Sequence, residues 1–437
     1  MKKLSLIFIL ASMLVACFSI KQQPIHRGQH FIVIGCSSAG YFAVKELEKL
    51  APDSVITCID QDADQSYKRT SLAALVSGKK TSSDIEMLPP ISKEKIFFDG
   101  KVIAINRAQK KIILANKQEI NYDKLLITTG THPLAPAHLE HVFLLPNVVH
   151  FNSQGDVRAI SKIISTKKRV LIVGTGLRSL ELADALSHIK PPLTISLLAR
   201  NNRFLGTKSD SRADKFIMQR ALAKGINLIN DGQIENIFRH VNDGLKVKMS
   251  DGSIIETDLV IFAIGNRPNS ELAKAAGLAL TKNNGIKTDT YLNTSDPHIF
   301  AAGDVASFID PLSKEYIQSS KWLAAKEQGI VAAHNMLGQK KSYTLNPPSY
   351  ASSFFELSIF TAGSVRENKF DNNSFIDVSP HHYFRVILKN QRIKAFIFLW
   401  EKNHKKPDIL FIKNKFIAQS PIGMNELKEK LLNFAKK

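Results

Sequence analysis

The segment FIVIGCSSAG, from Phe31 to Gly40, decides the fold. Its four leading apolar residues predict a strand that is buried on both faces, as in a parallel sheet. Gly35 then begins a tight turn, and the apolar residues 41–44 start a helical pattern. In such a unit the backbone N–H groups at the helix N-terminus come close to a pyrophosphate and bind it. The segment therefore predicts the first strand, turn and helix of a dinucleotide-binding unit.

An acidic residue follows at the expected distance. Asp60 ends the apolar run 55–60 and lies 25 residues after Gly35. An acid at the end of the second strand of such a unit binds a ribose hydroxyl. Ser37 replaces the middle glycine of the motif, so the backbone is expected to approach the phosphate less closely. An α/β turn that binds no nucleotide is the alternative interpretation.

Composition and charge describe a globular protein. The chain has 437 residues, enough for two or three domains, with 44% hydrophobic and 22% charged residues. The formal net charge of +20 favours an anionic lipid surface or an acidic partner. Because the basic residues are scattered, without a basic stripe or a binding module, we predict no nucleic-acid partner. The three cysteines fit neither a disulfide scaffold nor a metal site of the usual spacing, and we predict no metal.

The N-terminus has the pattern of an export signal. Two lysines precede the apolar run Leu4 to Val15, and Leu14-Val15-Ala16-Cys17 follows. This resembles a bacterial lipoprotein signal, with lipid attached to Cys17 after cleavage. Residues 1–29 are thus predicted to be a signal and tether of a membrane-anchored, exported lipoprotein on the periplasmic or outer face. The alternative is an inner-membrane anchor with the protein facing the cytoplasm, although Leu4 to Ile20 is shorter than the roughly 20 residues of a span.

A second glycine turn lies in RVLIVGTGLRSLE, residues 169–181. It repeats the first at an offset of 139 residues and places Gly174 and Gly176 at the turn. The position that would carry the ribose-binding acid is Ala199, followed by Arg200. Two units indicate either two nucleotides, or one nucleotide and a unit that has lost its ligand.

Three further apolar runs end in small residues. These are YDKLLITTG (122–130), DLVIFAIG (258–265) and SDPHIFAAGDVA (295–306). The carboxyl ends of strands in open α/β sheets are where ligands bind. The last hundred residues alternate like strands and finish with a helical pattern from Asn425, which predicts a separate α+β domain.

Taken together, these motifs resemble the FAD-dependent pyridine nucleotide-disulfide oxidoreductase superfamily. The resemblance extends over nearly everything after the tether, and it also includes IGNRPN (264–269) and the spacing Trp322, Ala325, Gln328, Gly329. The chain is most similar to the branch without a redox disulfide, which includes rubredoxin and ferredoxin reductases, the flavin part of nitrite reductase and apoptosis-inducing factor. The resemblance implies an α/β fold of two Rossmann-like dinucleotide-binding domains plus a C-terminal α+β interface domain. It would divide the chain into an FAD domain (30–150 and 285–340), an NAD(P) domain (151–284) and the interface domain (341–437).

The resemblance also implies ligand roles for individual residues. The residues at the FAD would be Gly35, Ser37, Ser38, Ala39, Gly40, Asp60, Arg69, Thr129, Gly130, Gly303, Asp304 and Trp322. The residues at the NAD(P) would be Gly174, Gly176, Leu177, Ser179, Arg200 and Gly265. Glu181 would position the nicotinamide or the flavin edge.

Each of the less common roles has a structural alternative. Trp322 could be a core aromatic residue, and Glu181 an ordinary acid stabilised by the helix dipole. Arg200 and Arg203 could bind a 2′-phosphate, which favours NADPH, or could simply be solvated. Arg178, within the second turn, could obstruct the phosphate or clamp it.

The cysteines depart from the disulfide-reducing branches of the superfamily. Thr70 occupies the place where those branches carry a reactive cysteine. Their chemistry needs a thiolate, so it is not expected here. Cys36 and Cys58 are expected to be buried and inert rather than a redox pair.

The predicted function is therefore an FAD-dependent NAD(P)H oxidoreductase. Hydride would pass from NADPH or NADH to the flavin, and electrons would pass to an unknown acceptor, such as an acidic redox protein or a small molecule. One alternative is a membrane quinone- or sulfide-type flavoprotein reductase. Another is a flavin-binding sensor or interaction protein that uses no nicotinamide, favoured by Ala199, Ser179 and export, because NAD(P)H is not expected outside the cytoplasm.

Overall fold

The computed structural model describes residues 28–432 except 63, 65, 93–95, 98–99, 311–313, 345–348, 367–373 and 405. The predicted lipoprotein signal and Cys17 lie outside the described residues. Within the described part of the chain, no helix combines the length and the apolar character needed to cross a membrane.

The first unit is built on a five-stranded parallel sheet. Its strands follow the order β19-β7-β1-β2-β3, namely Ile299–Ala301, Lys124–Ile127, His30–Ile34, Val55–Ile59 and Ile96–Phe97. The predicted strand 31–34 is β1, at the centre of the sheet and fully buried. Apolar residues on both faces explain this position, because only a strand covered on both sides buries every side chain.

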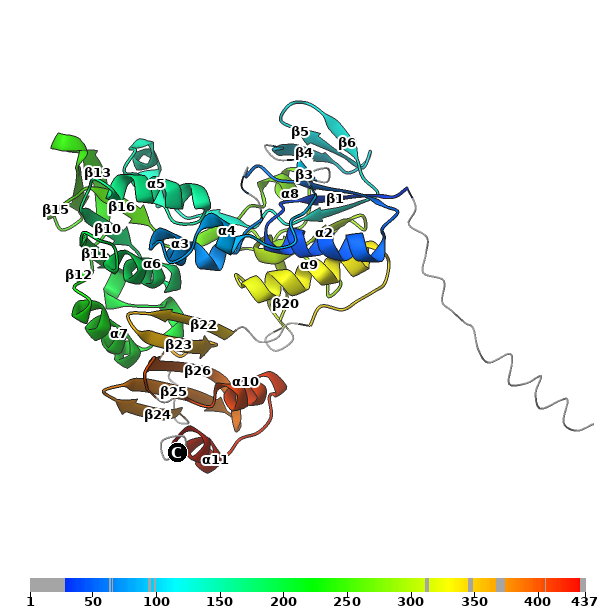
Figure 1. The fold of residues 1–437 in the computed structure, drawn as a ribbon. Coiled ribbons are helices and arrows are strands. Elements are labelled where there is room, and N and C mark those ends of the chain that lie inside the picture. The colour runs from blue at the N-terminus through cyan, green and yellow to red at the C-terminus, as the bar shows by residue number, and fades with distance from the viewer. Residues whose placement is uncertain are drawn as a thin grey trace, which may run out of the picture.

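Two long helices lie side by side over one face of this sheet (Figure 1). They are α2 (Ser38–Leu50) and α9 (Trp322–Met336). A methyl group on Gly329 would collide with the Ala39 carbonyl oxygen, so the two helix backbones approach closely. This contact brings residues nearly 300 positions apart to the same glycine turn.

The other face carries the antiparallel sheet β4-β5-β6 (Val102–Asn106, Lys111–Leu114 and Glu119–Asn121). Ile32 and Ile34 of β1 share one core with Ile105 and Ile112. Helix α8 (Glu271–Ala275) contributes Ala273 to the same core. Smaller elements complete this unit: β18 (Ile286–Lys287), β20 (Ala306–Ile309) and β21 (Tyr316–Ile317). The short helices α3 (Leu72–Val76) and α4 (Ser82–Ile85) pack on the core of the second unit.

The second unit repeats the arrangement. Its parallel sheet has the order β12-β11-β10-β16-β9, namely Asn227–Asn230, Thr194–Ala199, Arg169–Val173, Leu259–Phe262 and Val148–His150. Its helices are α5 (Gln154–Ile164), α6 (Leu177–Ser187) and α7 (Ser211–Ala223). An antiparallel sheet follows, made of β13 (Ile234–Arg239), β14 (Leu245–Met249) and β15 (Ile254–Thr257).

The chain crosses between the two units at a short antiparallel pair. It consists of β8 (Thr131–Pro133) and β17 (Asn266–Pro268). Strand β9 already belongs to the second sheet, and α8 already packs in the first unit. The predicted domain boundaries at positions 150 and 285 stay a prediction.

The C-terminal residues form a third unit on the five-stranded antiparallel sheet β22-β23-β26-β25-β24. Its elements are β22 (Ser349–Phe354), β23 (Leu357–Ala362), β24 (Ser374–Ser379), β25 (His382–Lys389), β26 (Arg392–Glu401), α10 (Ile409–Ala418) and α11 (Met424–Leu432). One face of the sheet packs against the second unit, as Figure 1 shows, and the other against α10 and α11. The predicted combination of two Rossmann-like units and an α+β domain is confirmed.

Candidate active site

The first glycine turn has the backbone geometry that a pyrophosphate needs. Gly35 has a φ of +97°, and a Cβ there would collide with the Thr128 carbonyl oxygen. Ser37 occupies the N-cap of α2, but its side chain accepts no hydrogen bond from the helix. The Oγ atom of Ser38 is buried and has no partner among the described residues. Uncapped N–H groups and an orphaned hydroxyl fit an anionic ligand, so the residues present suit the FAD that the sequence predicts.

Asp60 holds this turn in place. Its Oδ2 atom accepts a hydrogen bond of 2.6 Å from the Cys36 amide, and its Oδ1 atom accepts one of 2.9 Å from the Asp62 amide. The carboxylate therefore lies beside the turn, where the ribose-binding role was predicted.

A disulfide bond connects the turn to β2. Cys36 and Cys58 are bonded, with their Cα atoms 5.9 Å apart, and both are buried. The prediction that both cysteines are buried is confirmed, and the disulfide between them is a feature that the sequence analysis did not predict. Adjacent parallel strands bring their side chains together, and sequence spacing alone could not reveal this register.

Two arginines converge beside the turn on a single asparagine. Arg69 Nη1 donates to the Asn152 carbonyl oxygen over 2.8 Å, and Arg178 Nη1 donates to Asn152 Oδ1 over 2.8 Å. Arg69 Nε also lies 3.4 Å from Ser37 Oγ. Burial and the nearby charge of Arg69 both lower the pKa of Arg178. Two like charges held together in a partly buried place favour an anion between or beside them.

Asp304 interacts electrostatically with these arginines from a turn of the first unit that follows β19. It lies in the short 3₁₀ turn Gly303–Val305, and the Gly303 amide donates to Gln328 Oε1 of α9 over 2.7 Å. Burial raises the pKa of Asp304 to about 6, while the charges of Arg178 and Arg69 lower it. The structure thus brings together Arg69 and Asp304, which were predicted from distant motifs, and adds Arg178 from the second unit.

Glu181 lies on the second unit and contacts the C-terminal domain. It is the fifth residue of α6, and its carboxylate accepts a hydrogen bond from the Ser352 hydroxyl of β22. Burial raises the pKa of Glu181, while Ser352 and the charge of Arg178 lower it. This environment differs from that of an ordinary solvated acid at the start of a helix. The predicted role at the nicotinamide or flavin stays a prediction.

Two lysines flank one tyrosine where the three units meet. Lys208 Nζ and Lys321 Nζ each lie 4.5 Å from the centroid of the Tyr350 ring. Burial, followed by the charge of Lys208, lowers the pKa of Lys321 to about 7. Next to Lys321, Trp322 packs edge-to-face on Phe42, and its buried Nε1 atom has no hydrogen-bond partner within the described part of the chain.

The second glycine turn also has an open helix end. Gly174 has a φ of +115°, Gly176 is the N-cap of α6, and Leu177 is its first residue. The Ser179 hydroxyl is turned inward and donates to the Ala263 carbonyl oxygen over 3.0 Å. A phosphate at this turn would therefore be bound by backbone N–H groups rather than by that hydroxyl.

Ala199 and Arg200 follow the second strand of this unit directly. Ala199 is the last residue of β11, and Arg200 begins a 3₁₀ turn. A cavity of about 490 Å³ opens beside this turn, and Arg203, Lys215 and Arg366 line it. Asp210 and Asp214 also line the cavity, so it carries three basic and two acidic side chains near the position where the ribose-binding acid is missing.

Other predicted site residues are at the expected sheet edges. Gly130 and Gly265 both have positive φ values, and the Thr129 hydroxyl donates to the Asn269 carbonyl oxygen over 2.7 Å. Sequence reasoning missed Asn152, Lys208, Lys321, Tyr350 and Ser352. Only Lys321 had a sequence signal, since it directly precedes the predicted motif at Trp322.

Comparison with known proteins identifies the family. The model of the pyridine nucleotide-disulphide oxidoreductase family matches residues 29–335. The chain belongs to this family. The rubredoxin-NAD(+) reductase of Alcanivorax borkumensis is 32% identical over 285 residues, which cover 63% of this chain and 72% of that protein. The assimilatory nitrate reductase electron transfer subunit of Bacillus subtilis is 25% identical over 394 residues and 87% of this chain.

A solved structure supports the same fold. It is an engineered water-forming NADPH oxidase bound to NADPH, with a TM-score of 0.79 at 23% identity, over 90% of each chain. The chain spans 48% of the length of the Bacillus relative. The predicted family, its FAD and nicotinamide cofactors and its oxidoreductase class are confirmed at the level of the family.

Proposed function

We propose that this protein is an FAD-dependent oxidoreductase that takes hydride from NADPH and passes electrons to a redox protein. The observation that carries the proposal is the pair of uncapped glycine turns with the Arg69–Arg178–Asp304 cluster beside them. When bound, FAD would supply the hydride-accepting and electron-transferring chemistry.

The chain's own residues would bind and orient that cofactor. The N–H groups at the start of α2 and the Ser38 hydroxyl would hold the pyrophosphate, with Asp60 at the ribose. Arg69 would neutralise phosphate charge. Lys321 lies at the N-cap of α9, so an ammonium and a helix N-terminus would together favour an anion there.

NADPH is proposed over NADH because of the residues after β11. Ala199 removes the acid that would repel a 2′-phosphate, and Arg200 and Arg203 supply cations. The substitutions of the engineered NADPH oxidase include aspartate to alanine followed at the next position by alanine to arginine. The same Ala-Arg pair stands here.

Anaerobic reduction of the purified flavoprotein tests the function. NADPH is expected to bleach the flavin absorbance faster than NADH, by about tenfold or more, because charged hydrogen bonds are worth about 1.5–3 kcal/mol. The double variant Ala199→Asp, Arg200→Ala is expected to reverse the preference. A flavin that binds but that neither nucleotide reduces would overturn the proposal. That result would support the alternative of a flavin-binding sensor that uses no nicotinamide.

The acceptor is proposed to be an acidic redox protein. The relatives include a rubredoxin reductase and an electron transfer subunit, and the net charge of +20 suits an acidic surface. Reduction of a rubredoxin or a plant-type ferredoxin by the NADPH-reduced enzyme, weakening as salt rises, tests this. A rate that salt does not change would contradict an electrostatic partner.

We also propose that the protein is anchored to a membrane through lipid on Cys17 and exported. The lipoprotein-like N-terminus supports this, and so does the buried disulfide, because disulfides persist in oxidising compartments. Cell fractionation of the wild type and of Cys17→Ala tests it. Recovery of both in the same soluble fraction would contradict the anchor. Because NAD(P)H is not expected outside the cytoplasm, proof of export would favour the flavin-binding sensor over the NADPH-dependent enzyme.

A further inference from the structure

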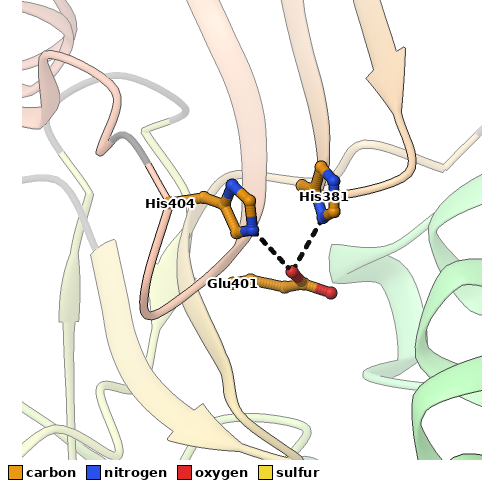
Figure 2. A group of neighbouring side chains, drawn as sticks. All are labelled: His381, Glu401 and His404. Atoms are coloured by element: carbon orange, nitrogen blue, oxygen red, sulfur yellow. Dashed lines mark hydrogen bonds and ion pairs between the residues drawn. The ribbon is translucent and has the colours of Figure 1, made fainter.

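A group of metal-binding side chains lies in the C-terminal domain, outside the cofactor site. Figure 2 shows His381, Glu401 and His404 pointing toward one another. His381 lies in the turn between β24 and β25, Glu401 is the last residue of β26, and His404 follows in the next turn. The three come from two chain segments that the antiparallel pairing of β25 and β26 brings together.

The donor atoms are close to the spacing of a metal's ligands. His381 Nδ1 lies 2.9 Å and His404 Nε2 lies 3.2 Å from the same Glu401 oxygen, Oε2. One donor atom from each of the three residues fits within a group no wider than 4.8 Å. Around tetrahedral zinc, with bonds of about 2.0–2.1 Å, neighbouring ligand atoms are roughly 3.3 Å apart. The donor atoms are therefore near the required spacing, and the two imidazole rings would have to turn to bring both nitrogens and the oxygen onto one ion.

The backbone fixes the residues before any ion binds. The Glu401 amide donates to the His381 carbonyl oxygen over 3.0 Å, and the His404 amide donates to the Glu401 carbonyl oxygen over 3.0 Å. The other carboxylate oxygen, Glu401 Oε1, is held by Arg220 Nη2 of α7 at 2.6 Å. Such a partner orients a ligating carboxylate while leaving its second oxygen free to bind.

The side chains are accessible enough to change their contacts. The exposed fractions of the His381 and His404 side chains are 50% and 44%. Their rings stack with centroids 3.8 Å apart and planes 12° apart. A metal lies in the plane of each imidazole that binds it, so the rings would turn away from this stack, and exposed side chains can do so. A water molecule would be the fourth ligand of a tetrahedral ion at this site.

We propose that His381, Glu401 and His404 form a site for a divalent transition metal, with Zn²⁺ as the ion. Two imidazole nitrogens and one carboxylate oxygen are a donor set that suits zinc. None of the three ligands is a cysteine, so the number and spacing of the cysteines in the sequence could not reveal this site. The ion would join the turn before β25 to the end of β26 and so stabilise that end of the two inner strands of the C-terminal sheet.

Titration of the metal-free full chain with ZnCl₂, and with CoCl₂ followed by visible absorption, tests the site. One Zn²⁺ per chain is expected, together with cobalt bands typical of a tetrahedral nitrogen and oxygen site. His381→Ala, His404→Ala and Glu401→Gln should each weaken binding by about tenfold or more. Binding should also weaken in acid, because imidazole must be neutral to bind.

His382→Ala is the matched control. His382 is the next residue along the chain and also pairs with a carboxylate, Asp377 Oδ2, at 2.7 Å. This variant should bind Zn²⁺ within about twofold of the wild type, and circular dichroism should show that all variants fold. Absence of binding, or equal affinity in the wild type and the three ligand variants, would overturn the proposal. Neither result depends on the flavin, so this test can fail while the proposed function stands.

Discussion

Arg178 Nη1 donates a hydrogen bond to Asn152 Oδ1 over 2.8 Å, inside the site rather than at its surface. The same asparagine accepts from Arg69 through its backbone carbonyl oxygen. One residue that follows β9 therefore holds an arginine from each dinucleotide unit. The sequence left open whether Arg178 would obstruct a phosphate or bind it. The structure favours binding, because the hydrogen bond to Asn152 holds the Arg178 guanidinium near Arg69.

Replacing Arg178 is expected to weaken FAD binding. Hydrogen bonds to charged groups contribute about 1.5–3 kcal/mol, so Arg178→Gln should raise the Kd of the apoprotein for FAD about tenfold or more. Quenching of flavin fluorescence on titration measures this. Arg158→Gln is the control, since Arg158 forms an exposed ion pair with Asp64 at 3.0 Å. Equal loss of affinity in both variants would mean that general charge, not the clamp, matters.

The Cys36–Cys58 disulfide is expected to stabilise the first unit. It closes a loop with a sequence separation of 22 residues, and a loop of this size corresponds to roughly 3 kcal/mol in the chain-entropy account. The variant Cys36→Ala, Cys58→Ala should unfold at a lower temperature than the wild type in non-reducing buffer. Thermal unfolding followed by flavin release measures the difference.

The reductant response provides the control for the disulfide. Both sulfurs are buried, so a reducing agent should act on the wild type mainly when the chain opens. Dithiothreitol should lower the wild-type midpoint and leave that of the double variant unchanged. If the wild type and the double variant unfold at the same midpoint temperature in non-reducing buffer, the disulfide bond contributes nothing to stability.

Features encoded by neighbouring residues were predictable from the sequence. The strand, turn and helix around Gly35 and Gly174 follow from short local patterns, and both are found as predicted. Asp60 and Asp304 could be placed because each follows a strand at a sheet edge. Their common location follows from the parallel arrangement of the strands.

Features that depend on distant packing were not predictable. The register of β1 against β2 decides that Cys36 meets Cys58, and no periodicity encodes it. Lys208, Lys321 and Tyr350 come from three different units and meet only after these units dock. The same holds for His381 and Glu401, which adjacent strand ends bring together across a hairpin.

Gly329 is expected to tolerate no side chain. A Cβ at this position would collide with the Ala39 carbonyl oxygen, which belongs to a packed helix backbone and cannot move aside cheaply. Gly329→Ala should lower the free energy of unfolding by about 1–3 kcal/mol or more, as overpacking does. Gly423→Ala is the control, because a Cβ there would meet nothing within 4 Å. Urea unfolding of both variants compares them, and equal stability would contradict the close helix contact.

Lys321 is expected to make the stability of the FAD-free protein depend on pH. Its pKa is lowered from 10.5 to about 7, so above pH 7 the folded chain releases a proton that the unfolded chain keeps until about pH 10. The contribution of Lys321 to the free energy of unfolding should therefore be lowest below pH 7 and should rise between pH 7 and about pH 10. Lys321→Met should be more stable than the wild type at pH 6 and should lack this part of the rise. Lys326→Met, on the same helix, should keep it. Melting temperatures measured from pH 6 to 10 test this. Curves for the wild type and Lys321→Met that run parallel would show that burial does not lower the pKa of Lys321.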